Sequence, residues 1–314
     1  MKILVTGGDG FIGRHLVHAL LERGDKVNVL DSHITSTPNY SHENLSRIIC
    51  DVSDLNENLP SDEPNVIVHL ASVAIPQLYM ENPDLVISPN VFGTNQVCKL
   101  AEKCGARVIF TSTSEVYGSI TDYHPIGTGI GELDSSLHTL LNARSPYSNA
   151  KKMGEEIVSS FVRNGLSGCS IRLFNVVGPN MDNAVLGYGR VFPNFVDSIN
   201  ESIPLQIYGD GEQTRCFLWI EDAIDAILRL IDFDGNLPLA INIGNPQPVT
   251  INSLAEKFQI FSNRLVGVQH LPKLPHEPKH RCPDISLAHT LLDWRPTIHL
   301  DEIIQRVVEE EVLE

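Results

Sequence analysis

Short apolar runs rich in β-branched residues alternate along the first part of the chain with longer stretches of helical periodicity. The short runs predict strands, and the longer stretches predict helices. Strands that alternate with helices are typical of βαβ units, so we predict an α/β fold built on a doubly wound parallel sheet with helices on both faces. The predicted strands are 2–6, 26–30, 66–70, 107–111 and 170–174, and the predicted helices are 15–23, 90–104 and 147–164.

The pattern changes after Gly178-Pro179, where loops rich in Gly, Pro and Asn replace the regular alternation. No hydrophilic linker separates the two parts, so we expect interleaved lobes rather than independent domains. We predict a first domain over 1–176, to which 217–246 return, and a smaller C-terminal lobe over 177–314. Within the smaller lobe and the returning segment we expect a helix at 220–231, a strand at 240–243, a proline-rich extended connection at 272–283 and a closing helix at 300–312.

Composition narrows the classes of function. The chain has 314 residues, of which 42% are hydrophobic, so it is long enough to form a core without disulfides or metals. Its formal net charge of −16 opposes binding to nucleic acid or to an anionic membrane surface. The six cysteines show no disulfide or metal spacing, and no signal peptide or long apolar run stands out, so we expect a cytoplasmic protein with reduced thiols.

A glycine-rich turn, Thr6-Gly7-Gly8-Asp9-Gly10-Phe11-Ile12-Gly13, lies between the first predicted strand and the first predicted helix. Glycines here let the backbone approach a pyrophosphate, whose charge the helix N-terminus stabilises. Asp31 ends the second strand about 20 residues later, where it can bind both ribose hydroxyls and repel a 2′-phosphate. The turn therefore predicts a Rossmann-type domain that binds NAD rather than NADP.

Tyr147 and Lys151 stand four residues apart at the start of a predicted helix, so both side chains lie on one face. An ammonium beside a phenol lowers the pKa of the phenol, and Tyr147 could then act as a general base toward an alcohol. The same spacing also occurs as a plain surface pair, and the glycine-rich turn is what favours the catalytic interpretation.

In combination these motifs resemble the extended short-chain dehydrogenase/reductases that modify nucleotide sugars. The resemblance covers nearly the whole chain. It rests on the glycine-rich turn, the strand end His69-Leu70-Ala71-Ser72, Thr113 before Val116-Tyr117-Gly118, Tyr147-x-x-x-Lys151, Phe174-Asn175, Gly178-Pro179, Arg215-Cys216-Phe217, Asn242-Ile243-Gly244-Asn245 and Arg281-x-Pro283-Asp284-Ile285.

The resemblance implies a shared chemistry. Tyr147 takes the proton of the sugar C4 hydroxyl, Thr113 hydrogen-bonds that hydroxyl, and NAD accepts the hydride, which leaves a 4-keto sugar. It also implies a homodimer, to which the helix beginning at Asn90 contributes. The implied cofactor-binding residues are Gly7, Gly10, Phe11, Ile12, Gly13, Asp31, Asp51, Val52, Leu70, Ala71, Ser72, Tyr147 and Lys151.

The residues after Thr113 bear on which reaction follows. In the 4,6-dehydratases that this chain resembles an Asp–Glu pair fills the next two positions, whereas this chain has Ser114 and Glu115. A Thr-Ser-Glu triplet is most similar to UDP-glucuronate decarboxylases, in which a 4-ketone makes the C5 carboxylate a β-keto acid that loses carbon dioxide. A 4-epimerase, a dehydratase and, from another class, a non-catalytic NAD-binding sensor remain alternatives.

The same resemblance implies a set of substrate-binding residues. Arg281 could assist protonation after loss of carbon dioxide or hold the diphosphate, and Pro275 departs from the pattern because a tyrosine is expected there. The implied substrate-binding residues are Ala74, Tyr79, Arg144, Asn175, Arg190, Tyr208, Arg215 and Arg281, and the implied catalytic residues are Thr113, Ser114, Glu115, Tyr147, Lys151 and Arg281.

One motif is set aside. His276-Glu277-Pro278-Lys279-His280 matches the H-E-x-x-H pattern of zinc proteases. That chemistry needs both histidines on one helical face, and Pro278 breaks a helix from inside. We therefore expect no metal site.

Overall fold

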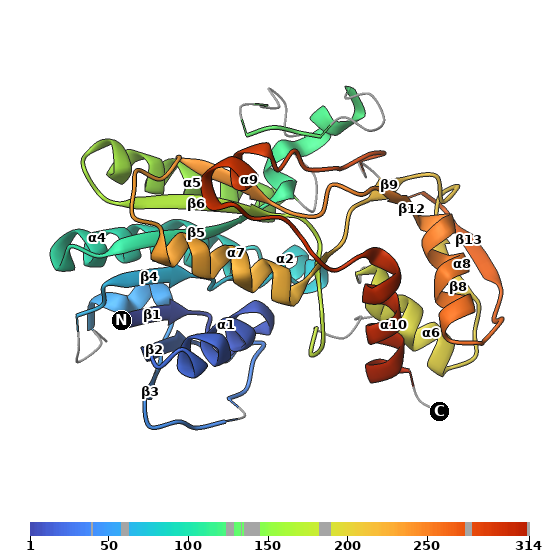
Figure 1. Cartoon of the computed structure of the whole chain (residues 1–314), viewed down its shortest axis with the longest axis horizontal. Coiled ribbons are helices and arrows are strands. Elements are labelled where there is room, and N and C mark those ends of the chain that lie inside the picture. The colour runs from blue at the N-terminus through green and yellow to red at the C-terminus, as the bar shows by residue number, and fades with distance from the viewer. Residues whose placement is uncertain are drawn as a thin grey trace. The chain divides into compact units, whose positions relative to one another are not determined.

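The computed structural model describes residues 1–38, 40–57, 63–123, 129–132, 134, 145–181, 190–273 and 278–312 (Figure 1). The chain forms two compact units. Unit 1 comprises Met1–Val116, Leu141–Leu173 and Ile224–Ile241, and unit 2 comprises Tyr117–Leu140, Phe174–Ala223 and Asn242–Glu314.

A seven-stranded parallel sheet, with the strand order β11-β6-β5-β4-β1-β2-β3, is the centre of the fold. The order steps outward in both directions from β1 and β4, which is the doubly wound arrangement predicted from the alternation of strands and helices. The fold class is therefore confirmed. The strands are β1 (Lys2–Thr6), β2 (Lys26–Asp31), β3 (Leu45–Ile49), β4 (Val66–His69), β5 (Arg107–Thr113), β6 (Gly168–Leu173) and β11 (Ala240–Ile243).

Strand β3 was not predicted from the sequence. It lies at the edge of the sheet, where it pairs only with β2. Its residues are half-buried or exposed, and Ile49 is 72% exposed. An edge strand that buries little side-chain area shows neither a continuous apolar run nor a clean alternation, so its sequence carries no strong signal.

Helices in unit 1 follow the strands. The predicted helix at 90–104 is interrupted, because Ser88–Gly93 forms one π-helical turn before α4. Pro89 in that turn lacks a backbone N–H, which is consistent with the local departure from α-helical hydrogen bonding. The elements are α1 (Phe11–Glu22), η1 (Val52–Glu57), α2 (Pro76–Glu81), α3 (Asp84–Ile87), η2 (Ser88–Gly93), α4 (Thr94–Cys104) and α5 (Ser145–Arg163).

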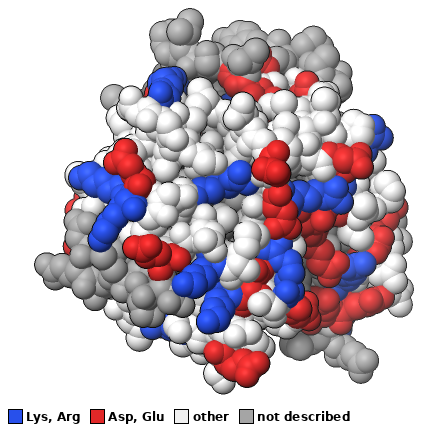
Figure 2. Space-filling view, turned by 60° about the vertical axis from the view of Figure 1, so that its left-hand side comes forward, with Lys and Arg blue, Asp and Glu red and all other residues white. Residues whose placement is uncertain are grey.

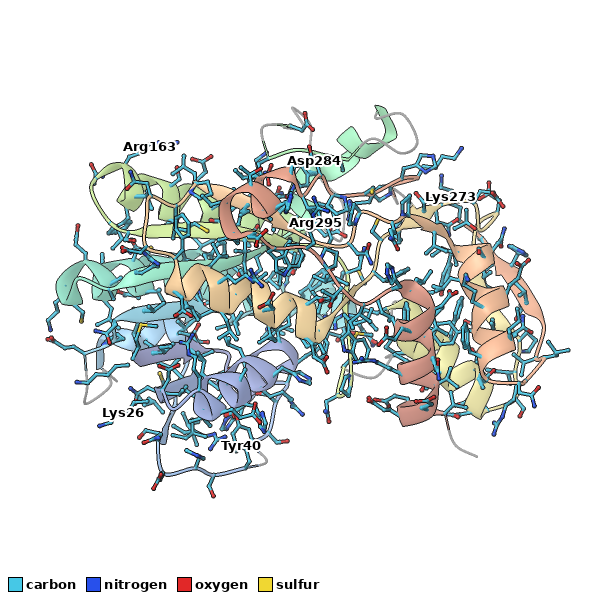
Figure 3. The ribbon with its side chains drawn as sticks, in the orientation of Figure 1. Lys26, Tyr40, Arg163, Lys273, Asp284 and Arg295 are labelled. Atoms are coloured by element: carbon cyan, nitrogen blue, oxygen red, sulfur yellow. The ribbon has the colours of Figure 1, made fainter. Side chains whose placement is uncertain are left out.

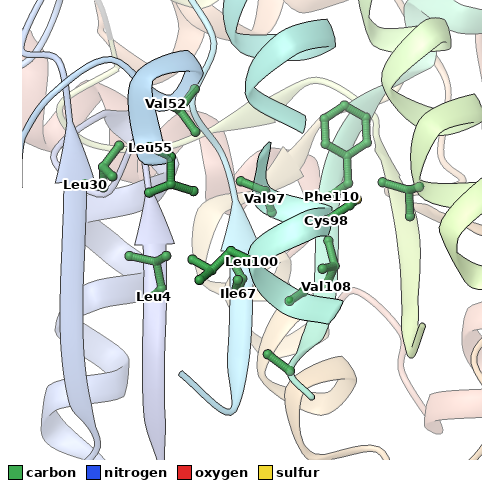
Figure 4. Close-up of a cluster of buried hydrophobic side chains, with 13 residues drawn as sticks. Leu4, Leu30, Val52, Leu55, Ile67, Val97, Cys98, Leu100, Val108 and Phe110 are labelled. Atoms are coloured by element: carbon green, nitrogen blue, oxygen red, sulfur yellow. The ribbon is translucent and has the colours of Figure 1, made fainter. Parts of the chain in front are cut away.

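A buried apolar cluster joins the sheet to its helices (Figure 4). Leu4, Ile67 and Val108 come from three adjacent strands and are 0% exposed, and α4 contributes Val97 and Cys98, also 0% exposed. Each fully buried aliphatic side chain contributes about 1.5–3 kcal/mol. The cluster therefore fixes strands β1, β4 and β5 and helix α4 relative to one another.

Unit 2 contains shorter strands and its own apolar core. Phe192 and Phe195 of α6 pack edge-on against Phe258 of α8, with ring centroids 5.0 and 5.5 Å away. The predicted helices at 220–231 and 300–312 and the strand at 240–243 are confirmed. The elements are β7 (Val176–Val177), α6 (Val191–Asn200), β8 (Leu205–Tyr208), β9 (Thr214–Arg215), β10 (Leu218–Trp219), β12 (Val249–Thr250), α8 (Ile251–Phe261), β13 (Val268–Leu271), α9 (Ser286–Leu292) and α10 (Leu300–Glu311).

Three elements cross the division between the units along the chain. The division falls inside η3 (Ser114–Tyr123), α7 (Ile220–Asp232) and β11. The predicted domain boundaries at 176 and 217–246 remain predictions.

The surface and the thiols agree with the composition. Figure 2 shows one face on which basic and acidic side chains are interspersed, with acidic side chains gathered along one side. All six cysteines are free thiols. Among the residues that the structure describes, no helix combines the length and the apolar character that a membrane span requires.

His69 is a fully buried histidine at the end of β4. Its Nε2 lies 3.2 Å from the carbonyl of Pro89, which can only accept, so Nε2 carries the proton and Nδ1 accepts from the Thr6 hydroxyl at 2.6 Å. Burial, together with the nearby Lys151 charge, lowers the pKa of His69 to about 3. The imidazole is thus neutral in the folded protein and links β1, β4 and η2.

The lowered pKa of His69 predicts that the folded protein loses stability as the pH falls. Below its ordinary pKa of 6.5 the unfolded chain binds a proton that folded His69 does not bind until about pH 3, so the free energy of unfolding falls as pH falls through that window. The effect has an upper limit of about 5 kcal/mol. We expect urea unfolding between about pH 4 and about pH 8 to give a shallower pH dependence for His69→Gln. His18→Gln, at a histidine whose side chain is 66% exposed, is the control. Equal slopes for wild type and His69→Gln would contradict the prediction.

Candidate functional site

The glycine-rich turn connects β1 to α1 and brings backbone to the edge of the sheet. Gly7 has a φ of +70°, and a Cβ on it would lie 2.7 Å from the backbone nitrogen of Ala71. A Cβ on Gly13 would lie 2.2 Å from the carbonyl oxygen of Gly7. Side chains are therefore excluded at both positions by neighbouring backbone. The turn packs directly against the end of β4, which the sequence motif alone does not reveal.

The start of α1 suits an anionic ligand. Gly10 precedes the helix in an extended conformation, and no side chain caps the helix. The first turn of a helix leaves its N–H groups without intrahelical partners and carries the positive end of the helix dipole. A pyrophosphate would be stabilised here without any lysine or arginine. The predicted cofactor residues Phe11, Ile12 and Gly13 form this first turn.

Asp31 ends β2 and is 7% exposed. Its Oδ1 accepts from the backbone N–H of His33 at 2.9 Å and from the Ser36 hydroxyl at 2.8 Å, and its Oδ2 accepts from the N–H of Asp9 at 3.0 Å. A carboxylate has about four acceptor sites, so one remains on Oδ2. We therefore expect Asp31 to accept one direct hydrogen bond from a ribose hydroxyl. Because its three hydrogen bonds hold the carboxylate in place, its negative charge cannot turn away from a 2′-phosphate and repels it.

The position of Asp31 predicts a preference for NAD over NADP. Close unit charges in partly solvated surroundings repel by about 1–4 kcal/mol, which gives a preference of about tenfold or more. We expect titrations to show this ratio for the wild type and a smaller ratio for Asp31→Asn, which keeps the shape and removes the charge. Equal affinity of the wild-type protein for the two dinucleotides would refute the assignment.

A charged network beside Asp31 was missed by sequence reasoning. Asp9 is 2% exposed; its carboxylate accepts from Arg47 Nε at 3.1 and 3.2 Å and lies 2.9 Å from His33 Nε2. The Arg47 guanidinium lies over the ring of Tyr40, 5.0 Å from its centroid. Figure 3 labels Tyr40 in the segment between β2 and β3. Because Asp9 neutralises Arg47, this arginine does not offset the charge of Asp31. The only sequence signal was an acid inside the glycine-rich turn.

The other predicted cofactor residues follow β3 and β4. Asp51 accepts from the N–H and the hydroxyl of Ser53 at 2.8 and 2.7 Å, which orients its carboxylate, and Val52 is 3% exposed. After β4, the N–H of Ala71 points to the Thr6 hydroxyl at 3.4 Å, and Asn90 Nδ2 donates to the Ser72 hydroxyl at 2.8 Å. Leu70, Ala71 and Ser72 therefore lie in the same unit as the glycine-rich turn, and the described residues fit a dinucleotide.

The predicted general base and its lysine lie on the first turns of α5. Lys151 is 3% exposed, and its Nζ donates to the carbonyl of Thr111 on β5 at 2.7 Å and lies 5.0 Å from the centroid of the Phe110 ring. Thr111 and Thr113 are two residues apart on one strand and share a face. Burial lowers the pKa of Lys151 to about 7, an effect that Glu155 partly opposes.

The ring of Tyr147 is stacked on the ring of Tyr79 from α2, with centroids 5.4 Å apart and planes 13° apart. Tyr79 is 3% exposed, so the stack is well fixed. Such pairs contribute about 0.5–1.5 kcal/mol beyond burial. Tyr79 was predicted to bind substrate, which stays a prediction; the stack shows that its ring limits the orientations that the Tyr147 ring can adopt. Ala74, two residues before α2, is half-buried in the same unit.

The triplet Thr113-Ser114-Glu115 marks the carboxyl end of β5. Thr113 is the last residue of the strand, and its hydroxyl accepts from the N–H of Glu115 at 3.3 Å. Ser114 is 3% exposed, whereas Glu115 is half-buried. Unit 1 thus carries Thr113, Tyr147 and Lys151 on two elements, β5 and α5, that pack against each other.

The remaining predicted substrate residues belong to unit 2, except Arg144, which lies outside the described residues. Asn175 has a φ of 39° and donates from Nδ2 to the carbonyl of Cys216 at 2.8 Å. Arg215 Nη1 donates to the carbonyl of Thr214 at 2.8 Å, and Arg281, which is 3% exposed, donates from Nη2 to the carbonyl of Gly118 at 3.4 Å. Tyr208 ends β8, and Arg190 directly precedes α6.

The zinc-protease pattern receives no structural test, because His276 and Glu277 also lie outside the described residues. His280 is described, and its Nδ1 lies 3.1 Å from the Thr214 hydroxyl. No group of metal-ligating side chains occurs among the residues that the structure covers. The expectation that the protein has no metal site stays a prediction.

Comparison with known proteins identifies relatives over nearly the whole chain. Residues 3–244 match the profile of the family described as "NAD dependent epimerase/dehydratase family". UDP-glucuronic acid decarboxylase 1 of Arabidopsis thaliana is 34% identical over 322 residues, which cover 98% of this chain and 69% of that protein.

Solved structures show the same fold. The UDP-glucose 4-epimerase of Thermotoga maritima with UDP-glucose superimposes with a TM-score of 0.88 at 26% identity, covering 99% of this chain and 98% of that one. An NAD-dependent NDP-hexosamine 5,6-dehydratase of tunicamycin biosynthesis gives a TM-score of 0.82 at 27% identity, covering 98% and 96%. The relatives catalyse three different reactions, so the choice among them depends on individual residues.

Proposed function

Because the chain belongs to the NAD-dependent epimerase/dehydratase family, we propose that it is a nucleotide-sugar enzyme that decarboxylates UDP-glucuronate or a related UDP-hexuronate. The observation that carries this choice is Ser114, which is 3% exposed between Thr113 and Glu115 at the end of β5. A 4,6-elimination needs an acid there to protonate the leaving group, and serine is a poor acid. The 34% identity to a plant UDP-glucuronic acid decarboxylase supports the same choice.

The residues of unit 1 account for the first step. Tyr147 accepts the proton of the C4 hydroxyl, Thr113 hydrogen-bonds its oxygen, and the charged form of Lys151 favours the phenolate. Bound NAD supplies the hydride acceptor for C4. Tyr79 stacks on Tyr147, 5.4 Å away between centroids, and holds the base in one orientation. This arrangement uses positioning and electrostatics.

Loss of carbon dioxide then requires little further chemistry. With a ketone at C4, the bond between C5 and the carboxyl carbon breaks and its electron pair forms an enolate across C5 and C4. The enolate takes a proton at C5. Glu115 is the second residue of η3, and its N–H donates to the hydroxyl of Thr113; we assign Glu115 to proton movement at this end of the sugar. In unit 2, Arg215 and Arg281 are the cations for the diphosphate, since arginine binds such groups through paired hydrogen bonds.

The test is incubation with NAD and a panel of UDP- and dTDP-sugars, with products identified by mass. We expect UDP-glucuronate to lose one carbon dioxide if NADH returns its hydride to C4, and one carbon dioxide with two hydrogen atoms if NADH is released. Glu115→Gln should lower kcat by about 10²-fold or more while changing nucleotide affinity little, because it removes only the ionisable group. Glu102→Gln, at an exposed position on α4, is the matched control.

Other products would select another reaction. Inversion at C4 of a UDP-hexose would favour a 4-epimerase, and loss of water from a UDP- or dTDP-hexose would favour a dehydratase. A protein that binds NAD but leaves every sugar unchanged would be a sensor, and all three outcomes would overturn the decarboxylase proposal.

We also propose that the protein is a cytoplasmic homodimer. The six free thiols favour a reducing compartment. Phe92 on η2 is 61% exposed and Met153 on α5 is 51% exposed, and these two elements pack together, which makes them a reasonable dimer surface. Light scattering should report a dimer for the wild type and a monomer for Phe92→Glu; a wild-type monomer would overturn the proposal.

A further inference from the structure

Two Arg-Cys dipeptides, Arg215-Cys216 and Arg281-Cys282, occur 66 residues apart in the chain and lie side by side in unit 2. Thr214 and His280 form a parallel β-bridge, and the N–H of Thr214 donates to the carbonyl of Lys279 at 2.9 Å. Cys216 follows Thr214 by two residues, and Cys282 follows His280 by two residues. Their thiols are hydrogen-bonded to each other.

The bridge between Thr214 and His280, two residues before the cysteines, brings their segments to the spacing of neighbouring strands. Neighbouring β-segments lie about 4.8 Å apart, and the Cα atoms of disulfide-bonded cysteines are usually about 4.4–6.8 Å apart. Both segments are held by further hydrogen bonds to their backbone carbonyls. Asn175 Nδ2 donates to the carbonyl of Cys216 at 2.8 Å, and the N–H of Ile130 donates to the carbonyl of Cys282 at 2.9 Å.

The two sulfurs have different environments. Cys216 is 0% exposed, whereas Cys282 is partly accessible. The Cys216 thiol donates to the Cys282 sulfur, and this hydrogen bond lowers the pKa of Cys282 and raises that of Cys216. Burial raises the pKa values of the cysteines at positions 50, 98, 104 and 169, so Cys282 is distinct among the six.

We propose that Cys216 and Cys282 form a redox-sensitive modification site that a peroxide closes to a disulfide, and that closure weakens binding of the nucleotide diphosphate. The Cys282 thiolate attacks one oxygen of hydrogen peroxide, which breaks the O–O bond and gives a sulfenic acid and hydroxide; the hydroxide takes up the proton that the Cys282 thiol released on ionising and becomes the first water. The Cys216 sulfur then attacks the Cys282 sulfur; the S–O bond breaks, and the departing hydroxide takes the Cys216 proton as a second water. The two thiols are oxidised by two electrons in total, and the peroxide is reduced to two waters.

The expected effect on binding follows from the sequence neighbours of the pair. Adjacent residues of an extended segment point to opposite sides, so we infer that Arg215 and Arg281 lie on the side of their segments away from the sulfurs. Forming an S–S bond of about 2.05 Å from hydrogen-bonded sulfurs draws the two segments together and displaces both arginines. Asn175, anchored on the Cys216 carbonyl, moves with them. This consequence rests on the proposed substrate role of the two arginines, whereas disulfide formation does not.

The experiment treats the reduced full-length protein with hydrogen peroxide and maps peptides by mass without reduction. We expect two peptides linked through Cys216 and Cys282, with a mass two hydrogen atoms below the sum of the separate peptides. Dithiothreitol should release the two peptides from each other. The affinity for UDP, measured by calorimetry, should fall by about tenfold and recover after reduction. Cys216→Ser and Cys282→Ser should lose the response, and Cys104→Ser, the matched control at another partly accessible thiol, should keep it.

The outcomes separate this proposal from the proposed function. Oxidation of Cys282 to a sulfinic acid with no crosslink, or crosslinking that leaves the UDP affinity unchanged, would overturn it. So would a peroxide response that survives in Cys216→Ser. The UDP-glucuronate assay plays no part in these readouts, so failure of the decarboxylase assignment would leave the crosslink test decisive.

Discussion

Replacing Tyr147 with phenylalanine is expected to lower kcat by about 10²–10⁴-fold, because the variant lacks the phenol that we propose accepts the C4 hydroxyl proton. Phenylalanine keeps the ring that stacks on Tyr79, so the fold of α5 and the affinity for NAD should change little. Steady-state turnover of the sugar found in the product screen measures the first effect, and fluorescence titration with NAD measures the second.

Tyr40→Phe is the matched control for this substitution. It removes the same hydroxyl from a ring that packs beneath Arg47, and it should retain activity. A Tyr147→Phe protein that keeps more than about a third of the wild-type rate would remove Tyr147 from the mechanism, since general-base loss costs far more.

Replacing Lys151 with methionine is expected to lower activity by about 10²-fold or more and at the same time to raise stability at neutral pH. Lys151 is buried, and its pKa falls from 10.5 to about 7 in the folded protein. Between these pH values the unfolded chain holds a proton that the folded protein has lost, so stability rises with pH across that window. The rise has an upper limit of about 5 kcal/mol.

Methionine has a similar length and no charge, so its variant should lack this pH dependence. Chemical denaturation at about pH 6, 8 and 10 would measure the slope. Lys152→Met, one residue along the same helix, is the control and should keep both the slope and the activity. A Lys151→Met protein that unfolds more easily than the wild type at neutral pH would show that the Lys151–Thr111 hydrogen bond outweighs the cost of burying the charge.

Local patterns in the sequence predicted the elements that carry the site. The glycine-rich turn, the end of β2 at Asp31 and the pairing of Tyr147 with Lys151 follow from spacings within a single strand, turn or helix. Strand β3 was missed because an edge strand that buries little side-chain area shows no clear apolar pattern. The π-helical turn η2 was missed because a local distortion of a helix leaves its apolar pattern nearly unchanged.

The sequence by itself determined the fold class, because covalent geometry sets periods of two and of 3.6 residues. The residues proposed for the reacting centre follow instead from the resemblance of its motifs to a known family. Only the tertiary structure decided the environments of those residues. The burial of Lys151 against Thr111, the stacking of Tyr79 on Tyr147, the ion pair between Asp9 and Arg47, and the pairing of Cys216 with Cys282 each join distant segments. Their geometry depends on strand order and on packing across the sheet, and no local spacing encodes either of these.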